Sequence, residues 1–202
     1  YWIQRAGAEN WAHVRQHTNH YIAASAAVAT NLIQRHEIPA DRISVVHEGI
    51  PVANGSGPAP GNQRARLRTA LGIPADAFIV GGSGMEYWRK GKSLFVQLAV
   101  ELARRNLARP SHFLWVGRPG SEEEKQQLAH DMATAGVDGR VHWVGEVSNP
   151  LDYFSCFDAF ALVSREDPFP LVCLEAASLK IPVLCFAKAG GIPELLEADA
   201  GF

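Results

Sequence analysis

The sequence is poor in cysteine, in net charge and in long apolar runs. Three cysteines among 202 residues, Cys156, Cys173 and Cys185, show no metal-ligand spacing, so we expect buried, reduced thiols and a cytoplasmic protein. The formal net charge is only -2, and no run of lysine and arginine indicates a nucleic-acid partner. No apolar stretch approaches membrane-spanning length, and no signal peptide is visible.

The remaining composition is that of an ordinary globular protein. With 47% hydrophobic and 20% charged residues, the chain can bury a core. Several of its eight histidines fall in the first 50 residues, but no HExxH-type pattern occurs, so we predict no metal site. The chain begins at Tyr1 rather than Met and stops at Phe202, and we expect a protein that is cut at both ends.

Breaker residues divide the chain near position 50. Residues 1–50 have the pattern helix, strand, helix, strand, with Ser25 suited to cap the second helix and Pro39 to end it. Residues 51–61 read P-V-A-N-G-S-G-P-A-P-G, which indicates either a linker between domains or a long surface loop.

From position 62 onward, strand and helix patterns alternate. The expected strands are 78–82, 113–117, 141–144, 159–163 and 182–186. Ser121 and Glu124 form a capping-box pattern, and a helix is expected over residues 92–106. This alternation predicts an α/β domain with a doubly wound parallel sheet, in which ligands bind outside the carboxyl ends of the strands.

An acidic loop leads into one of these helices. Residues 164–175 read S-R-E-D-P-F-P-L-V-C-L-E, after a short apolar strand, and the helix is expected to begin near Phe169 or Pro170. Its first backbone N–H groups would attract a phosphate or sugar oxygen. Asp167 and Glu175 would accept hydrogen bonds from sugar or ribose hydroxyls. The alternative is that Asp167 caps the helix and that Glu175 is merely solvated.

A glycine-rich loop follows the first strand of the same domain. Residues 81–91 read G-G-S-G-M-E-Y-W-R-K-G, which is neither a Walker A loop nor a GxGxxG fingerprint. Glycine lets the backbone approach a phosphate closely, and Arg89 and Lys90 supply positive charge. Alone, this loop would be interpreted as a structural turn. Together with the acidic loop, it predicts a site that one nucleotide-sugar would fill.

Four motifs resemble glycosyltransferase family 4. Residues 167–176, D-P-F-P-L-V-C-L-E-A, are similar to that family's E-P-F-G-L-V-x-L-E-A signature, and W-R-K-G at 88–91 resembles its lysine-glycine motif. A-G-G-I-P-E at 189–194 and the segment 39–50 also resemble family segments, in the same order.

This resemblance implies a two-domain GT-B architecture with Rossmann-like domains. Residues 1–50 would be the tail end of the N-terminal acceptor domain, 51–61 the linker, and 62–202 a C-terminally truncated donor domain.

The resemblance also implies a function and a set of roles. The full-length protein would be a retaining glycosyltransferase of hexosyltransferase type, in bacterial polysaccharide biosynthesis, with a UDP or GDP sugar as donor and no cofactor. Lys90 would neutralise the diphosphate, Asp167 would contact the transferred sugar, and Glu175 would bind the ribose hydroxyls. The further donor-binding residues would be Ser83, Gly84, Arg89, Phe169, Pro170, Leu171 and Val172.

The chain departs from the family pattern at three positions. Met85 stands where many members carry Arg, Pro170 where Gly is usual, and Asp167 where Glu is usual. A carbohydrate or lipid-linked acceptor would bind through the missing domain, with peripheral membrane association in the full-length protein, so we expect the fragment alone to be inactive. The alternatives are a nucleotide-sugar epimerase or phosphorylase of the same architecture, or a non-catalytic module that kept the fold.

Overall fold

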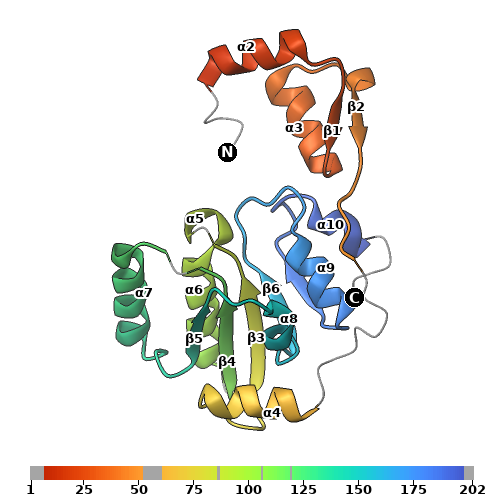
Figure 1. The fold of residues 1–202 in the computed structure, drawn as a ribbon. Coiled ribbons are helices and arrows are strands. Elements are labelled where there is room, and N and C mark those ends of the chain that lie inside the picture. Colours follow the sequence, from red (N-terminus) through yellow and green to blue (C-terminus); the bar gives the residue numbers. More distant parts are fainter. Residues whose placement is uncertain (1–6, 52–60, 86, 106, 119, 198–202) are drawn as a thin grey trace. The chain divides into compact units, whose positions relative to one another are not determined.

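The computed structural model describes residues 7–51, 61–85, 87–105, 107–118 and 120–197 (Figure 1). The chain forms two compact units. Unit 1 consists of Tyr1–Gly49, Glu166–Pro170 and Ala187–Phe202, and unit 2 of Ile50–Arg165 and Leu171–Phe186. The division therefore does not follow a single cut along the chain.

Unit 2 contains a five-stranded sheet with the order β5-β4-β3-β6-β7. Every pair of neighbouring strands is parallel, which confirms the predicted fold class. The strands are β3 (Phe78–Ser83), β4 (Ser111–Val116), β5 (Val141–Gly145), β6 (Ala159–Leu162) and β7 (Val183–Cys185).

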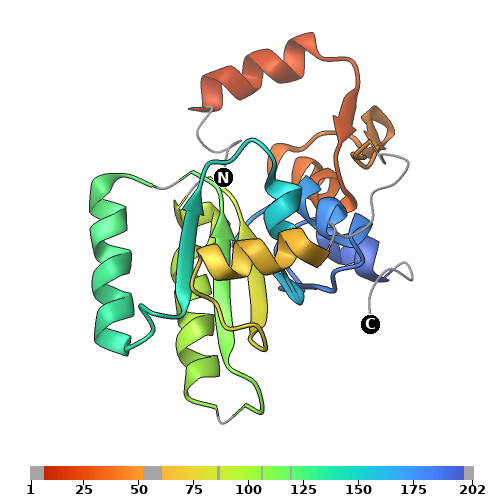
Figure 2. The same ribbon diagram turned by 60° about the horizontal axis from the view of Figure 1, so that its bottom comes forward.

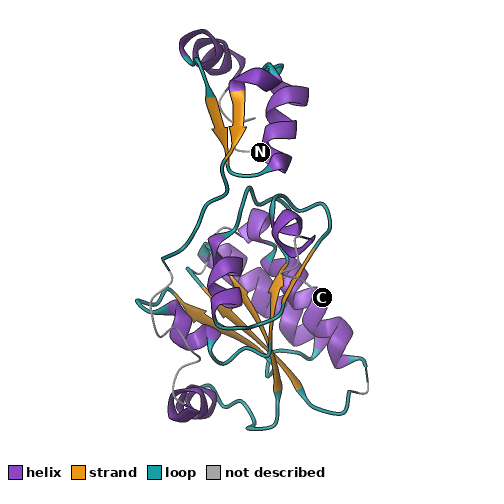
Figure 3. Cartoon of the chain, turned by 90° about the vertical axis from the view of Figure 1, so that its right-hand side faces the viewer, coloured by secondary structure: helices purple, strands orange, loops and turns teal. Residues whose placement is uncertain are grey.

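Helices cover both faces of this sheet (Figure 3). A Cβ atom added at Gly81 would collide with Phe157, whereas one added at Gly82 would collide with Trp115 and Phe95, so the two neighbours point to opposite, filled faces. In Figure 2, α4 lies in front of the sheet and α6 behind it. The helices of unit 2 are α4 (Gly61–Ala70), α5 (Tyr87–Lys90), α6 (Lys92–Ala103), α7 (Glu122–Ala135), α8 (Pro150–Phe154) and α9 (Leu171–Ser178).

The larger core of unit 2 lies between the sheet and helices α6 and α7. Phe95 of α6 makes edge contacts with Phe113 and Trp115 of β4, at ring-centroid distances of 5.7 and 5.0 Å. Leu128 and Met132 of α7 complete the cluster. Each large apolar side chain buried in this way contributes on the order of 2 kcal/mol.

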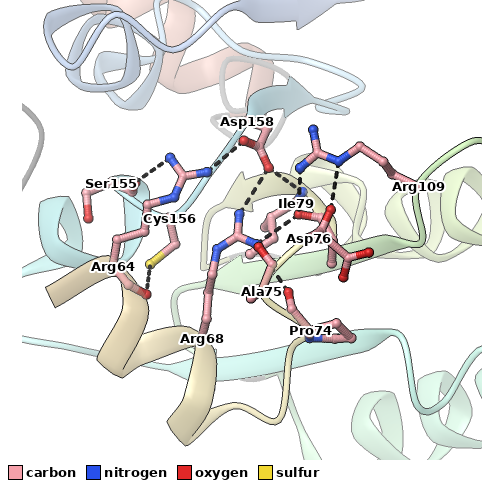
Figure 4. Close-up of polar contacts among 11 residues, drawn as sticks. Arg64, Arg68, Pro74, Ala75, Asp76, Ile79, Arg109, Ser155, Cys156 and Asp158 are labelled. Atoms are coloured by element: carbon pink, nitrogen blue, oxygen red, sulfur yellow. Dashed lines mark hydrogen bonds and ion pairs between the residues drawn. The ribbon is translucent and has the colours of Figure 1, made fainter. Parts of the chain in front are cut away.

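A partly buried ionic network holds α4 at the amino ends of two strands (Figure 4). Asp158, directly before β6, accepts hydrogen bonds from Arg64 at 2.7 Å, from Arg68 at 3.2 Å and from the Ile79 N–H group at 2.8 Å. Because the Arg68 side chain is 7% exposed, Asp158 supplies a counter-charge that water cannot.

Local sequence signals are largely confirmed. Ser121 and Glu124 form the capping box of α7, and the Ser25 hydroxyl accepts from the Val28 N–H group at the start of α3. Two predicted elements are shorter than expected: the helix over 92–106 ends at Ala103, and the strand over 182–186 is reduced to Val183–Cys185. Of the cysteines, Cys156 and Cys173 are buried, whereas Cys185 is only half-buried.

Unit 1 is built around two short parallel strands, β1 (Tyr21–Ala23) and β2 (Ile43–Val45). Its helices are α2 (Gly7–His17), α3 (Ala26–His36) and α10 (Ile192–Leu195), with a 3-10 turn at Ala40–Arg42. Tyr21, Ala23, Leu32 and Ile38 form its small core. Throughout the described ranges, no helix is both long enough and apolar enough to cross a membrane.

Candidate functional site

The strand order of unit 2 reverses between β3 and β6. From β3 the chain moves outward to β4 and β5, and then returns to place β6 on the other side of β3. Ligands of open α/β sheets bind beyond the carboxyl ends of the strands at such a reversal. The glycine-rich loop after β3 and the loop after β6 both begin here, and the Arg165 N–H group joins them by donating to the Arg89 carbonyl at 2.8 Å.

The glycine-rich loop packs tightly against its neighbours. Ser83 is the half-buried last residue of β3. The Gly84 N–H group donates to the Val116 carbonyl at 3.1 Å, and the Gly84 carbonyl accepts from the Trp115 indole at 3.0 Å. A Cβ atom at Gly117 would lie 2.4 Å from the Gly84 carbonyl oxygen. The backbone at Gly84 is therefore held in place by close approaches that a side chain at Gly117 would prevent.

Lys90 lies against this loop. It ends the short helix α5, is half-buried, and its Cγ would be 2.7 Å from a Cβ atom at Gly84. Arg89 is likewise half-buried beside it. The next residue, Gly91, has a φ of +76°, and a Cβ atom there would lie 2.0 Å from the Val163 carbonyl oxygen. Glycine at this position thus lets α6 begin against the end of β6.

Lys92, two residues after Lys90, has a different role. Its side chain is buried, and its ammonium group donates to the Arg118 carbonyl at 2.7 Å. Burial lowers the pKa of Lys92, and the nearby Glu124 opposes this shift only in part. Of the two lysines that flank Gly91, Lys92 is therefore the one that is buried in the interior of the protein.

Arg165 is a residue of this region that sequence reasoning missed. Its guanidinium group donates to the Trp88 carbonyl at 2.7 Å and to the Ser93 hydroxyl at 3.2 Å, and lies 5.5 Å from the centre of the Trp88 ring. Arg165 therefore fixes the segment that carries Lys90. The available signal was its place in the acidic loop, directly before Glu166 and Asp167.

Helix α9 presents the third part of the site in unit 2. It begins at Leu171, so Leu171 and Val172 lie in its first turn, where backbone N–H groups have no partner within the helix. Glu175 is half-buried, and burial raises the pKa of its carboxyl group. Within the described part of the chain, no hydrogen bond or ion pair engages this carboxylate. A partly desolvated acceptor is thus available to a donor from outside the protein.

The remaining predicted residues belong to unit 1. Asp167 is 6% exposed, and its backbone forms a parallel bridge with Gly190. The Asp167 N–H group donates to the Ala189 carbonyl at 2.7 Å. A Cβ atom at Gly190 would lie 1.6 Å from the Asp167 carbonyl oxygen, so the predicted glycine pair is what lets these two loops meet. Phe169 and Pro170 are also buried.

Glu194 and His47, whose roles sequence reasoning also missed, organise unit 1 around this loop. The Glu194 carboxylate accepts from the N–H groups of Ala26 and Ala27 and from the His47 ring, each at 2.9 Å. Partial burial raises the pKa of Glu194, but the three hydrogen bonds outweigh it and the net pKa is lowered. The His47 ring stacks on Phe169 at 5.0 Å.

The predicted site residues are therefore distributed over both units. Unit 2 brings Ser83, Gly84, Arg89 and Lys90 together at the end of β3, and carries Leu171, Val172 and Glu175 on α9. Unit 1 holds the other three: Asp167, Phe169 and Pro170. Met85, within the glycine-rich loop, is 59% exposed. The roles assigned to these residues stay predictions.

A family model described as "Glycosyl transferases group 1" matches residues 76–202. The chain is 30% identical over 178 residues to D-inositol 3-phosphate glycosyltransferase from Corynebacterium efficiens, covering 85% of this chain and 41% of that protein. It is 31% identical over 134 residues to the lipopolysaccharide core biosynthesis glycosyltransferase LpsD from Rhizobium meliloti, covering 66% of this chain and 35% of that protein.

Among solved structures, the fold is similar to that of Anabaena Alr3699/HepE in complex with UDP and glucose. The TM-score is 0.80 at 24% identity, covering 96% of this chain and 52% of that one. The chain thus spans about two fifths of the curated relative from Corynebacterium efficiens and about half of the solved protein.

Proposed function

Because this chain belongs to the group 1 glycosyltransferases, we propose that it is the donor-binding half of a retaining glycosyltransferase of hexosyltransferase type. The donor is a nucleoside-diphosphate sugar of UDP or GDP type, and no further cofactor takes part. The UDP bound in the structure of the similar Anabaena protein makes UDP the first nucleotide to test.

The carboxylate of Glu175, which has no partner among the described residues, carries this proposal. A half-buried carboxylate without a protein donor is unfavourable by itself, since burial already raises its pKa. Two neighbouring ribose hydroxyls supply the donors that are missing, and each charge-assisted hydrogen bond of this kind is worth about 1.5–3 kcal/mol.

Lys90 supplies the charge that the leaving group needs. When the bond between the sugar and the diphosphate breaks, negative charge develops on the diphosphate, and a nearby ammonium group and helix N–H groups stabilise it. In this proposal Lys90 and Arg89 provide the positive charge, and the first turn of α9 provides the N–H groups. Ser83 and Gly84 line the phosphate side, where the glycine backbone permits a close approach.

Asp167 is proposed to hold the transferred sugar. Its carboxylate would accept hydrogen bonds from sugar hydroxyls, with the backbone of Phe169 and Pro170 beside it. The acceptor, a carbohydrate or a lipid-linked carbohydrate, would bind through the part of the full-length protein that this chain lacks, in the cytoplasm or at the membrane periphery.

Calorimetric titration of the chain and of the full-length protein with UDP and GDP tests the proposal. We expect saturable binding of one nucleotide, weakened roughly tenfold or more by Glu175→Ala, since one lost hydrogen bond to a charged group costs more than 1.4 kcal/mol. Glu123→Ala, an exposed carboxylate on α7, should leave the affinity unchanged. The proposal is wrong if the full-length protein binds neither nucleotide, or if both variants bind equally well.

A further inference from the structure

A cavity with basic walls lies in unit 2 at the edge of the sheet opposite the glycine-rich loop. It has a volume of about 470 Å³ and is formed where α6 ends and where β4 and β5 begin. Parallel strands of six residues, such as β4, separate this edge from the glycine-rich loop by about 20 Å. The polar residues around it are Arg104, Arg105, Arg109, Ser111 and Arg140.

Four of the residues around this cavity are arginines, and three of them have no carboxylate partner among the residues that the structure describes. Arg104 pairs with Glu101 at 3.2 Å on the surface. Arg109 donates to the backbone carbonyls of Asp76 and Ala77. No ion pair involves Arg105, Arg109 or Arg140 within the described part of the chain. The cavity therefore carries an excess of positive charge.

The neighbouring arginines of α4 make the contrast clear. Arg64 and Arg68 line an adjoining cavity that also includes Arg109, but both donate to Asp158 (Figure 4). These two arginines thus share one carboxylate, whereas Arg105, Arg109 and Arg140 have none among the described residues. A helix C-terminus explains basic residues such as Arg104 and Arg105. It does not explain Arg140, which precedes β5.

Ser111 provides an independent indication of a ligand. It is 2% exposed, lies in the wall of the cavity, and its hydroxyl has no hydrogen-bond partner among the described residues. A buried hydroxyl without a partner costs on the order of 1–3 kcal/mol. An oxygen atom of a bound anion would satisfy it, because rotation about the Cα–Cβ bond redirects the hydroxyl.

We propose that this cavity, with Arg105, Arg109, Arg140 and Ser111, binds a phosphate-bearing anion at a site separate from the glycine-rich loop. Arginine suits this ligand because its planar guanidinium group binds two phosphate oxygens at once. The ligand is either a free phosphate compound or the head group of an anionic phospholipid.

The test is a titration of the isotope-labelled chain with inorganic pyrophosphate, followed by the amide NMR signals of Ser111 and Arg140. Both signals should shift saturably. The double variant Arg105→Gln/Arg140→Gln should weaken this binding roughly tenfold or more, since a lost hydrogen bond to a charged group costs about 1.5–3 kcal/mol. Ser111→Ala should weaken it without destabilising the free protein. Arg66→Gln, an exposed arginine of α4 outside both cavities, should bind like the wild type.

The amide signals of Gly84 and Gly117 report separately on the opposite edge of the sheet. They should respond alike in the wild type, the double variant, Ser111→Ala and Arg66→Gln. The single variant Arg105→Gln replaces the double variant if the latter does not fold, since Arg105 is exposed.

Sedimentation with phosphatidylcholine vesicles, with and without phosphatidylglycerol, shows which of the two phosphate ligands binds. Binding to anionic vesicles that requires Arg105 and Arg140 indicates a phospholipid head group, and the absence of such binding indicates a free phosphate compound. Unchanged Ser111 and Arg140 signals, or equal shifts in the double variant and Arg66→Gln, would overturn the proposal.

Discussion

Gly91 shows how one residue without a side chain positions the charged groups around it. Its φ of +76° and the 2.0 Å approach to the Val163 carbonyl oxygen admit no other residue without movement. It separates Lys90, at the glycine-rich loop, from the buried Lys92. Two lysines close together in the sequence can therefore have different surroundings.

We expect Gly91→Ala to destabilise unit 2 by about 2 kcal/mol or more, because the new Cβ atom adds both backbone strain and a clash with main-chain atoms. Urea unfolding measures this change. Gly139→Ala is the matched control, since a Cβ atom there has no neighbour within 4 Å and the backbone needs no positive φ. Equal stability of the two variants would contradict the steric role of Gly91.

At the scale of elements, α4 depends on ionic contacts more than on its apolar side chains. The Asp158 carboxylate accepts from Arg64, Arg68 and the Ile79 N–H group of β3. Because Asp158 itself directly precedes β6, one carboxylate connects a helix with two strands (Figure 4). Arg68 also donates to the carbonyls of Pro74, Ala75 and Ala77, which places its charge deep in the domain.

Asp158→Ala should lower the free energy of unfolding by about 3–5 kcal/mol, because it leaves the buried Arg68 guanidinium without its counter-charge. Denaturant unfolding with circular dichroism provides the measurement. Glu146→Ala removes the partner of Arg118 from a pair in which both side chains are 63% exposed, and should cost less than about 1 kcal/mol. A small effect of Asp158→Ala would mean that Arg68 finds other acceptors.

At the scale of the whole molecule, segments far apart in the sequence form one unit. The loop at Glu166–Pro170 and the segment from Ala187 join the first 49 residues in unit 1. Glu194 is central to this assembly, because it caps the start of α3 and holds His47, which in turn stacks on Phe169. A residue of the predicted donor loop is thus supported from both ends of the chain.

Glu194→Gln should weaken unit 1 at neutral pH by about 0.5–2 kcal/mol, as the loss of a helix cap does. Faster hydrogen exchange at Ala26 and Ala27 would report it. Because the folded pKa of Glu194 is lowered, its contribution is present above the ordinary value of 4.5 and is lost as pH falls through the lowered pKa. As the pH falls through this range, Glu194→Gln should therefore lose less of its free energy of unfolding than the wild type. Glu48→Gln, an exposed neighbour of His47, should retain the wild-type pH dependence.

The sequence by itself determined the parallel α/β architecture and the loops that carry the candidate site. Apolar runs such as the one ending in Phe160 and Leu162, and the Ser121–Glu124 capping box, encode local structure directly, because propensity, capping and periodicity act over a few residues. Gly84 and Gly91 lie in the predicted glycine-rich segment, but their close approaches to the Lys90 side chain and the Val163 carbonyl oxygen are found only in the structure.

Only the tertiary structure decided which charged residues are free for a ligand. In the sequence, Lys92 and Arg68 cannot be distinguished from exposed residues. In the structure both side chains are buried and donate hydrogen bonds to backbone carbonyl groups. Arg165 and Glu194 gain their contacts from chain segments up to 168 residues away, as in the bond between Ala26 and Glu194. Folding also brings the arginines around Ser111 to one cavity. Burial, pairing and steric approach are properties of residues brought together by folding, and no local pattern contains them.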